Sequence, residues 1–396
     1  MKLHRIFFMM GMLLLAGSPA PAGAQTNSLA SLFTNVTPRP TVVPRRASVI
    51  FLAFHGLGLG DLSCYGQTNY QTPNLDRLAA GGTRFNNYRV TGDDLAQVQA
   101  ALMAGNTAPF SAGSPTLAGR LQAVGYYTVM SGEWTLGPQP WTQGFDDFGG
   151  FLSQDEARNY YSDFFWRYAP KAIYDSTNRI RLPFSGREEI YANTGGQKGQ
   201  YLPDFFMKAV AQFARIKQPD FANHYRPFFL LASQPAPVSA TPGKDDYPVP
   251  TDAPYSGEAW PQAARNRAAL ITRLDDGVGR LLEQLHKLGM TNNVVIFVTG
   301  AAAPEKFADT NLNFLEIKGE VRGGASPDRL RVPMIVYWPG HIPAGRVSDE
   351  PWNVCDVAPT ILEIAYGKPS PDMTGVSRLP LLLGQTKAPA GPPERH

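Results

Sequence analysis

Short apolar runs alternate along this chain with segments whose apolar side chains recur at helical spacing. The runs have the length and composition of buried strands, and they are Ala47 to Phe54, Tyr126 to Met130, Pro227 to Ser233, Asn293 to Thr299 and Val332 to Trp338. Continuous apolar runs of this kind are typical of strands that are covered on both faces. Strands that alternate with helices predict an α/β fold, a mostly parallel sheet with helices on both faces.

The longest expected helix extends from Ala263 to Leu288. Its apolar positions follow one another at intervals of three or four and therefore lie on one face: Leu270, Leu274, Val278, Leu281, Leu285 and Leu288. Shorter helices are expected at Leu75 to Ala80, Asp94 to Ala104, Ser114 to Val124, Pro203 to Ile216 and Val357 to Ala365. These helices lie between the expected strands or after the last one.

Three segments interrupt this alternation. Gln139 to Gly199 is aromatic and glycine-rich without a clear period, and Pro235 to Gly257 is rich in proline. The second follows a strand end and is expected to cross the rim where open α/β sheets bind ligands. Lys387 to His396 is expected to be a disordered tail. We therefore expect one α/β domain over residues 47–386.

The N-terminus has the pattern of a secretory signal peptide. A basic start precedes the apolar run Ile6 to Ala16, and the small residues Ala22 to Ala24 suit cleavage, so residues 1–24 are the expected signal. The run is about half of the roughly 20 residues that a spanning helix needs, so no lasting membrane anchor is expected. Residues 25–46 are expected to be a linker, and the mature chain is expected to be secreted or periplasmic.

Composition excludes several functional classes. With 43% hydrophobic and 17% charged residues, the chain is unlike a disordered protein. The 36 Lys and Arg residues against 33 Asp and Glu, without a basic cluster, provide no electrostatic surface for a nucleic acid. Cys64 and Cys355 are too few for a disulfide framework or a thiolate metal site. Whether they pair, and the oligomeric state, remain open.

A series of short matches follows one order from Ala47 to Gly384. They are Val49 to Gly66, Thr72 to Ala79, Gly132 to Gly137, Gly144 to Asp146, Asn159 to Tyr161, Arg273 to Leu282, Val332 to Gly340 and Asp356 to Leu362. In this order they resemble the sulfatase family of the alkaline phosphatase superfamily, which includes the arylsulfatases. The resemblance implies an alkaline phosphatase-like fold. In active members it implies hydrolysis of sulfuric esters with a divalent metal such as calcium and a formylglycine nucleophile.

The family's metal and nucleophile positions fall on residues without the required chemistry. Two adjacent aspartates that would bind the metal are His55 and Gly56, and the later Asp-Asn pair is Gly300 and Ala301. A hard cation such as calcium requires oxygen ligands, which these side chains do not provide. The Cys that becomes formylglycine corresponds to Leu95, so no formylglycine is expected there. We therefore expect neither a metal nor another cofactor.

The positions for sulfate binding and proton transfer differ as well. The Arg after the nucleophile corresponds to Gln99, the Lys and His of Gly-Lys-Trp-His to Glu133 and Thr135, and a later His to Val238. A carboxylate at position 133 would repel a sulfate instead of attracting it. Only Lys318 matches, loosely, a position where the family keeps a Lys, and it is the one candidate catalytic residue.

These losses favour an exported pseudo-sulfatase, a catalytically inactive protein that keeps the fold. Its partners would be a sulfated or glycan ligand, or a protein, bound in the remnant cleft. In the family a small antiparallel subdomain follows the stretch that matches Leu379 to Gly384. Only twelve residues follow it here, so that subdomain is expected to be absent or reduced.

A second hypothesis is a sulfuric ester hydrolase, acting on an aryl or carbohydrate sulfate, with a rebuilt active site. It would require a metal or a strong anion-stabilising group at new positions. Its candidate residues are His55, Asp61, Asp93, Asp94, Glu133 and Lys318. Asp93 or Asp94 is equally suited to cap the following helix, because a short carboxylate accepts hydrogen bonds from the free backbone N–H groups.

A third hypothesis is a non-catalytic glycan-binding or structural protein. It rests on the aromatic segment from Tyr160 to Tyr174, with Trp166 and Tyr168 as the candidate contacts. Aromatic side chains are also what a packed insertion needs, because they bury large apolar areas. The packed insertion is therefore the favoured interpretation of this segment.

Overall fold

The computed structural model describes residues 46–170, 173–174, 180–181, 183–304, 330–368 and 370–385. The expected signal peptide (1–24), all but the last residue of the linker (25–46) and the tail (387–396) lie outside these ranges, and so does Lys318. Within these ranges, no helix has both the length and the apolar character that crossing a membrane requires.

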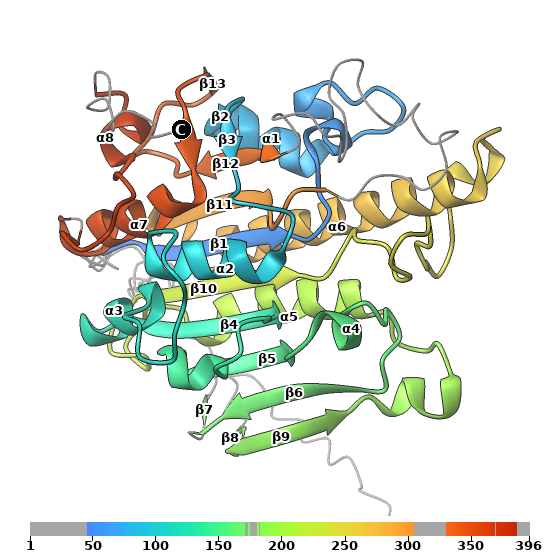
Figure 1. The fold of residues 1–396 in the computed structure, drawn as a ribbon, viewed down its shortest axis with the longest axis horizontal. Helices are drawn as coiled ribbons and strands as arrows, with labels where there is room; N and C mark the ends of the chain where they lie inside the picture. The colour runs from blue at the N-terminus through green and yellow to red at the C-terminus, as the bar shows by residue number, and fades with distance from the viewer. Residues whose placement is uncertain are drawn as a thin grey trace, which may run out of the picture. The chain divides into compact units, whose positions relative to one another are not determined.

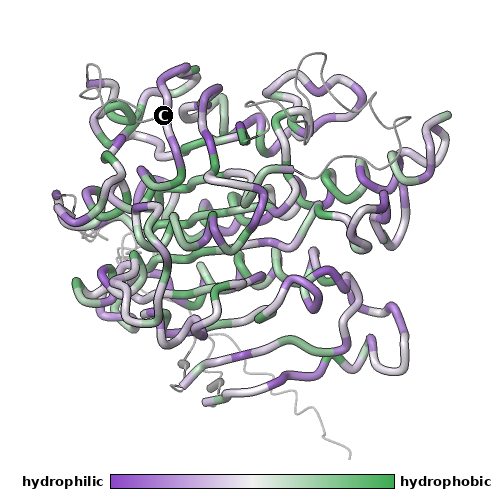
Figure 2. Tube along the Cα trace, in the orientation of Figure 1, coloured by the Kyte–Doolittle hydropathy of each residue, from purple (hydrophilic) through white to green (hydrophobic). Residues whose placement is uncertain are grey.

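A mixed sheet of ten strands forms the centre of the fold, in the order β13-β2-β12-β11-β1-β10-β4-β5-β6-β9 (Figure 1). Its middle consists of parallel strands: β11 (Val294–Gly300), β1 (Ser48–Phe54), β10 (Phe228–Gln234), β4 (Tyr127–Glu133) and β5 (Asp147–Phe151). All residues of β1, β10, β4 and β11 are buried. Helices on both faces explain why these strands are continuously apolar (Figure 2).

Shorter or antiparallel strands extend the sheet on both sides. Beyond β11 lie β12 (Met334–Tyr337), β2 (Thr83–Phe85) and β13 (Arg346–Ser348), and beyond β5 lie β6 (Phe164–Ala169) and β9 (Phe184–Glu189). Two small sheets pair β3 (Tyr88–Arg89) with β14 (Trp352–Asn353) and β7 (Ile173–Tyr174) with β8 (Ile180–Arg181). The segment from Gln139 to Gly199, which shows no period in sequence, thus contains three strands of the main sheet.

Helices cover the two faces of the sheet. One face packs against α2 (Leu95–Ala104), α3 (Leu117–Ala123) and α7 (Val357–Tyr366), and the other against α1 (Pro73–Gly81), α5 (Leu202–Ile216) and α6 (Gln262–Lys287). Two short helices, α4 (Gln154–Ala157) and α8 (Leu379–Leu382), complete the set that the described residues form. The predicted apolar face of α6 is confirmed, since its positions from Leu270 to Leu285 are buried. The α/β class and the covered, mostly parallel sheet are likewise confirmed.

Side-chain caps fix where α2 and α3 begin. Asp94 accepts a hydrogen bond at 2.9 Å from the backbone N–H of Ala96, so the capping interpretation of this residue is confirmed. Helix α3 begins at Leu117, later than the expected Ser114, because the hydroxyl of Thr116 accepts from the N–H of Gly119. The cap at Asp94 makes Leu95 the first residue of α2 and directs it towards the ends of the strands.

Candidate functional site

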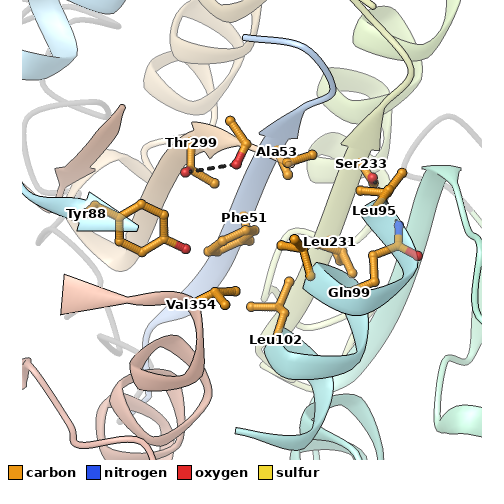
Figure 3. A pocket seen from close by; sticks show the side chains of 13 residues that line it. Phe51, Ala53, Tyr88, Leu95, Gln99, Leu102, Leu231, Ser233, Thr299 and Val354 are labelled. Carbon is orange, nitrogen blue, oxygen red and sulfur yellow. Dashed lines mark hydrogen bonds between the residues drawn. The ribbon is translucent and has the colours of Figure 1, made fainter. Parts of the chain in front are cut away.

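The carboxyl ends of β11, β1, β10 and β4 lie side by side because the strands are parallel neighbours. They carry Gly300, His55, Gln234 and Glu133 respectively, with His55 directly after the last residue of β1. Leu95 approaches the same edge from α2 (Figure 3). The structure therefore brings together positions that lie almost 250 residues apart in the sequence and that the family resemblance assigns to one site.

An apolar cavity of about 20 Å³ occupies this position. Leu95, Gln99, Gly300 and Ala301 line it together with core residues such as Phe51 (Figure 3). A space of this size holds about one water molecule. This cavity is therefore too small to hold a sulfate ester.

Neither position 95, where the family has its nucleophile, nor the adjacent aspartates or the two cysteines provide a replacement nucleophile. The side chain of Leu95 is fully buried and has no atom that could attack sulfur. Asp93 and Asp94 are exposed, and Asp94 is engaged as the helix cap. Cys64 and Cys355 are both free thiols, and burial raises their pKa to about 12 and about 11. Both thiols thus stay protonated at neutral pH and are poor nucleophiles.

His55 and Glu133 form a buried pair between β1 and β4. The Nδ1 atom of His55 lies 2.9 Å from Oε2 of Glu133, and the side chains are 5% and 1% exposed. The resemblance places a carboxylate at position 55 and a Lys at position 133, so an imidazole and a carboxylate stand here in place of a carboxylate and an ammonium group. The two side chains bond to each other through Nδ1 and Oε2, whereas the groups that the resemblance implies would face a metal and a sulfate.

Gln99 holds the end of β4 in place. Its Nε2 donates to the backbone oxygen of Glu133 at 2.7 Å, and its Oε1 accepts at 2.9 Å from both the N–H and the hydroxyl of Thr135. Two positions that the resemblance assigns to catalysis, Gln99 and Thr135, therefore bond to each other. Their polar groups are directed to the scaffold, and no charge is available there for an anion.

Two buried side chains at the ends of β4 and β10 keep polar atoms without a hydrogen-bond partner. They are Oε1 of Glu133 and both amide atoms of Gln234, all within the described part of the chain. Gln234 is the last residue of β10, and its side chain was missed in the sequence because the expected strand ended at Ser233. A polar residue directly after a buried apolar run, at the ligand edge of a parallel sheet, was the available signal.

Two positions where the family has metal ligands, Gly56 and Gly300, leave little space for a larger side chain. Gly56 has φ +88°, and a Cβ there would lie 3.0 Å from the backbone of Val238. A Cβ at Gly300 would lie 2.4 Å from the backbone oxygen of Leu57. His55 and Ala301 provide no oxygen ligand, and no group of three metal-binding side chains occurs among the described residues. The residues present therefore do not fit a calcium ion.

Asp61, one of the candidates for a rebuilt site, is part of the scaffold. Its Oδ2 accepts from the N–H of Gly58 at 2.7 Å and from Arg267 at 3.0 Å, and its Oδ1 accepts from Tyr70 at 3.3 Å. Arg267 also donates to the backbone oxygens of Gly56 and Pro237. Both charged side chains are at most 1% exposed. This ion pair ties the loop after β1 to α6, and Asp61 is not available to a substrate.

The aromatic segment is a packed part of the sheet. Trp166 lies on β6, is partly buried and donates through Nε1 to Glu156 at 3.2 Å. Tyr168 stacks on Trp141 with their ring centroids 4.8 Å apart. The structural interpretation of these residues is therefore favoured over an open glycan platform.

The comparison with known proteins agrees with the α/β fold described above. A family model described as Sulfatase matches residues 48–368. The chain belongs to the sulfatase family. Its alkaline phosphatase-like α/β fold is the one that the resemblance implied.

Individual sulfatases resemble this chain over most of its length. Human arylsulfatase A is 29% identical over 88% of the chain and 70% of its own length. Human N-acetylgalactosamine-6-sulfatase is 29% identical over 86% of the chain and 66% of its own length. Among solved structures, Ps i-CgsB in complex with k-i-k-neocarrahexaose superposes with a TM-score of 0.65 at 22% identity, over 86% of this chain and 77% of that one. At that identity the superposition supports the fold alone.

Proposed function

We propose that this sulfatase-family protein is a pseudo-sulfatase, a member without sulfuric ester hydrolase activity. The observation that carries the proposal is the buried side chain of Leu95, which lines a small apolar cavity at the nucleophile position. Sulfuric ester hydrolysis needs a nucleophile and fixed positive charge where negative charge develops. At the family's nucleophile position Leu95 has no nucleophilic atom, and no Lys or Arg is among the described residues that line the cavity.

The electrostatics of the edge support the same conclusion. The buried carboxylate of Glu133 is compensated by His55, which leaves no net positive charge for a sulfate. A bound metal would supply that charge, but the closed positions of Gly56 and Gly300 do not fit one. No cofactor is therefore part of the proposal. If the protein were active, the reaction expected of the family would be sulfuric ester hydrolysis with a divalent metal such as calcium.

A turnover assay tests the proposal directly. The purified mature protein is incubated with 4-nitrophenyl sulfate, with EDTA or with Ca²⁺, Mg²⁺, Mn²⁺ or Zn²⁺ in turn, and its metal content is measured. We expect 4-nitrophenol release at the rate of the buffer alone under every condition. Release that follows the protein peak in gel filtration and falls in the His55→Gln or Asp94→Ala variant would overturn the proposal.

A hydrolase with a rebuilt site is the second candidate, and one observation favours it. The buried His55–Glu133 pair has the arrangement of a general base and the carboxylate that orients it. Asp61 is engaged by Arg267, Asp93 and Asp94 lie on the surface, and Lys318 lies outside the described residues. Loss of the measured turnover in Glu133→Gln, with retention in Asp93→Ala, would support this candidate.

Export and ligand class belong to the proposal as well. The N-terminal pattern supports a secreted or periplasmic protein, and mass spectrometry of the exported chain should find Gln25 as its first residue. A sulfated or glycan ligand, or a protein partner, fits a family whose solved members include one bound to k-i-k-neocarrahexaose. Binding to a glycan array that is lost with Trp166→Ala or Tyr168→Ala would support the glycan alternative, and a blank array would count against it. A nucleic acid remains outside the proposal.

A further inference from the structure

A groove of about 680 Å³ lies between α1 and the C-terminal part of α6, on the other face of the sheet from α2. It includes Thr291 and Ile296, near the amino end of β11, whereas the small cavity lies at the carboxyl ends of the strands. The two spaces share no lining residue. The volume is in the range of pockets that bind small organic ligands.

The two helices that form the groove are held together rigidly. Asp275 on α6 accepts from the N–H of Leu75 at 2.8 Å and from the side-chain amide of Asn74 at 2.8 Å. Gly279 allows the close approach of the helices, because a Cβ there would lie 2.6 Å from the side chain of Asn74. The groove is therefore part of the folded scaffold and does not require a ligand to form.

The floor of the groove is apolar and its rim is polar. Leu78, Leu285 and Ile296 are buried beneath the floor, and the partly buried Leu282 is its accessible apolar side chain. The rim carries Arg77 from α1 and Tyr337 from β12. From α6 it carries Asp276, Arg280, Glu283 and His286. An occupant with an apolar body and a polar end would match both parts.

The charges of the rim favour an anion. In the described ranges, no hydrogen bond or ion pair engages the side chains of Arg77, Arg280 or His286. Of the two acidic residues, Glu283 pairs with Lys287 at 2.6 Å, which leaves Asp276 as the uncompensated carboxylate of the described rim. Two guanidinium groups thus face one carboxylate. Guanidinium groups bind sulfate and phosphate oxygens through paired N–H donors.

We propose that this groove binds an organic anion, a sulfate or phosphate ester whose apolar body lies against the partly buried Leu282 and Tyr337 while its oxyanion contacts Arg77 and Arg280. The assignment does not depend on the proposed loss of catalysis, because the groove lies apart from the strand ends and involves no turnover.

Calorimetric titration of the mature chain with 4-nitrophenyl sulfate and, separately, 4-nitrophenyl phosphate tests the assignment. We expect one site per chain, with affinity reduced about tenfold or more in the Arg77→Gln/Arg280→Gln double variant. Asp276→Asn should strengthen binding, since it removes the opposing charge. Lys208→Gln, an exposed cation on α5 outside the groove, is the matched control and should bind like the unmodified chain.

Two further comparisons show how much of the affinity comes from the apolar body of the ligand and how much from its oxyanion. Inorganic sulfate should bind more weakly than the aryl ester, because it lacks the body that covers the apolar floor. The ratio of the two esters identifies which oxyanion is preferred. Absence of binding, or equal affinity in the double variant and the control, would overturn the assignment, provided that both variants melt like the unmodified chain. Turnover in the separate assay would contradict the proposed loss of catalysis and leave this assignment unaffected.

Discussion

Two buried carboxylates at the carboxyl edge of the sheet have contrasting surroundings. Both oxygens of Asp61 are hydrogen-bonded, with Arg267 as its charged partner. Glu133 has His55 on one oxygen, and no described residue bonds to the other. Asp61 fixes the loop after β1, whereas position 133 corresponds to a ligand-binding Lys in the family. The two carboxylates therefore differ in how fully their oxygens are bonded: both oxygens of Asp61 have partners, whereas Oε1 of Glu133 has none among the described residues.

The largest effect should come from Asp61→Asn. The variant leaves the buried guanidinium of Arg267 without its countercharge. The NH2 group of the new asparagine also replaces one of the two accepting oxygens and then faces another hydrogen-bond donor. We expect the free energy of unfolding to fall by about 3–5 kcal/mol, the usual cost of breaking a buried ion pair. Denaturant unfolding monitored by tryptophan fluorescence measures it. Lys208→Ala, at an exposed position on α5, should stay within about 0.5 kcal/mol of the unmodified chain.

Glu133→Gln makes the same chemical change in the other cluster. Its new amide nitrogen can occupy the place of the unpartnered Oε1, and its oxygen can still accept a hydrogen bond from Nδ1 of His55. The loss should be about 1 kcal/mol. Equal losses in Asp61→Asn and Glu133→Gln would show that the two clusters are equally structural and would remove the contrast between them.

Gly300→Asp introduces a carboxylate at a position where the resemblance places a metal ligand, and a loss smaller than that of Asp61→Asn is expected. The new Cβ would lie 2.4 Å from the backbone oxygen of Leu57, so the loop must shift. Overpacking of this kind costs about 1–3 kcal/mol. The thermal midpoint should fall and should not recover when Ca²⁺ is added. Recovery with Ca²⁺ would show that the site is only missing ligands and is not closed.

The parallel core could be predicted because its apolar runs and the one-sided pattern of α6 depend on local sequence. The clustering of His55, Glu133 and Gly300 could be predicted as well, through the family order of the motifs. The strands between Gln139 and Gly199 could not, because β9 is largely exposed at an edge and β5 contains adjacent glycines, so neither shows a clear alternation. A strand shows a clear alternation only where one face is apolar and packed and the other is polar, and neither of these two strands has that contrast.

The hydrogen-bond partners of the buried polar residues could not be predicted from the sequence either. Arg267 lies three positions before Leu270, on the apolar side of α6, and only the fold shows that Asp61 meets it there. The contact between His55 and Glu133 joins residues 78 positions apart. The groove between α1 and α6 depends on the close approach at Gly279. Each of these features is a tertiary arrangement of residues that look ordinary in sequence.

The smallest effect should have the opposite sign. Gln234→Met keeps a similar volume and removes two buried polar atoms that have no partner in the described structure. We expect the free energy of unfolding to rise by a few tenths of a kcal/mol to about 1 kcal/mol, because an unsatisfied buried amide is costly. Gln99→Met is the matched control and should lower it by about 1–3 kcal/mol, since Thr135 and the backbone oxygen of Glu133 would lose their partners. Destabilisation by Gln234→Met would mean that its amide is satisfied by a bound water or ion, and the strand ends would then retain a polar site.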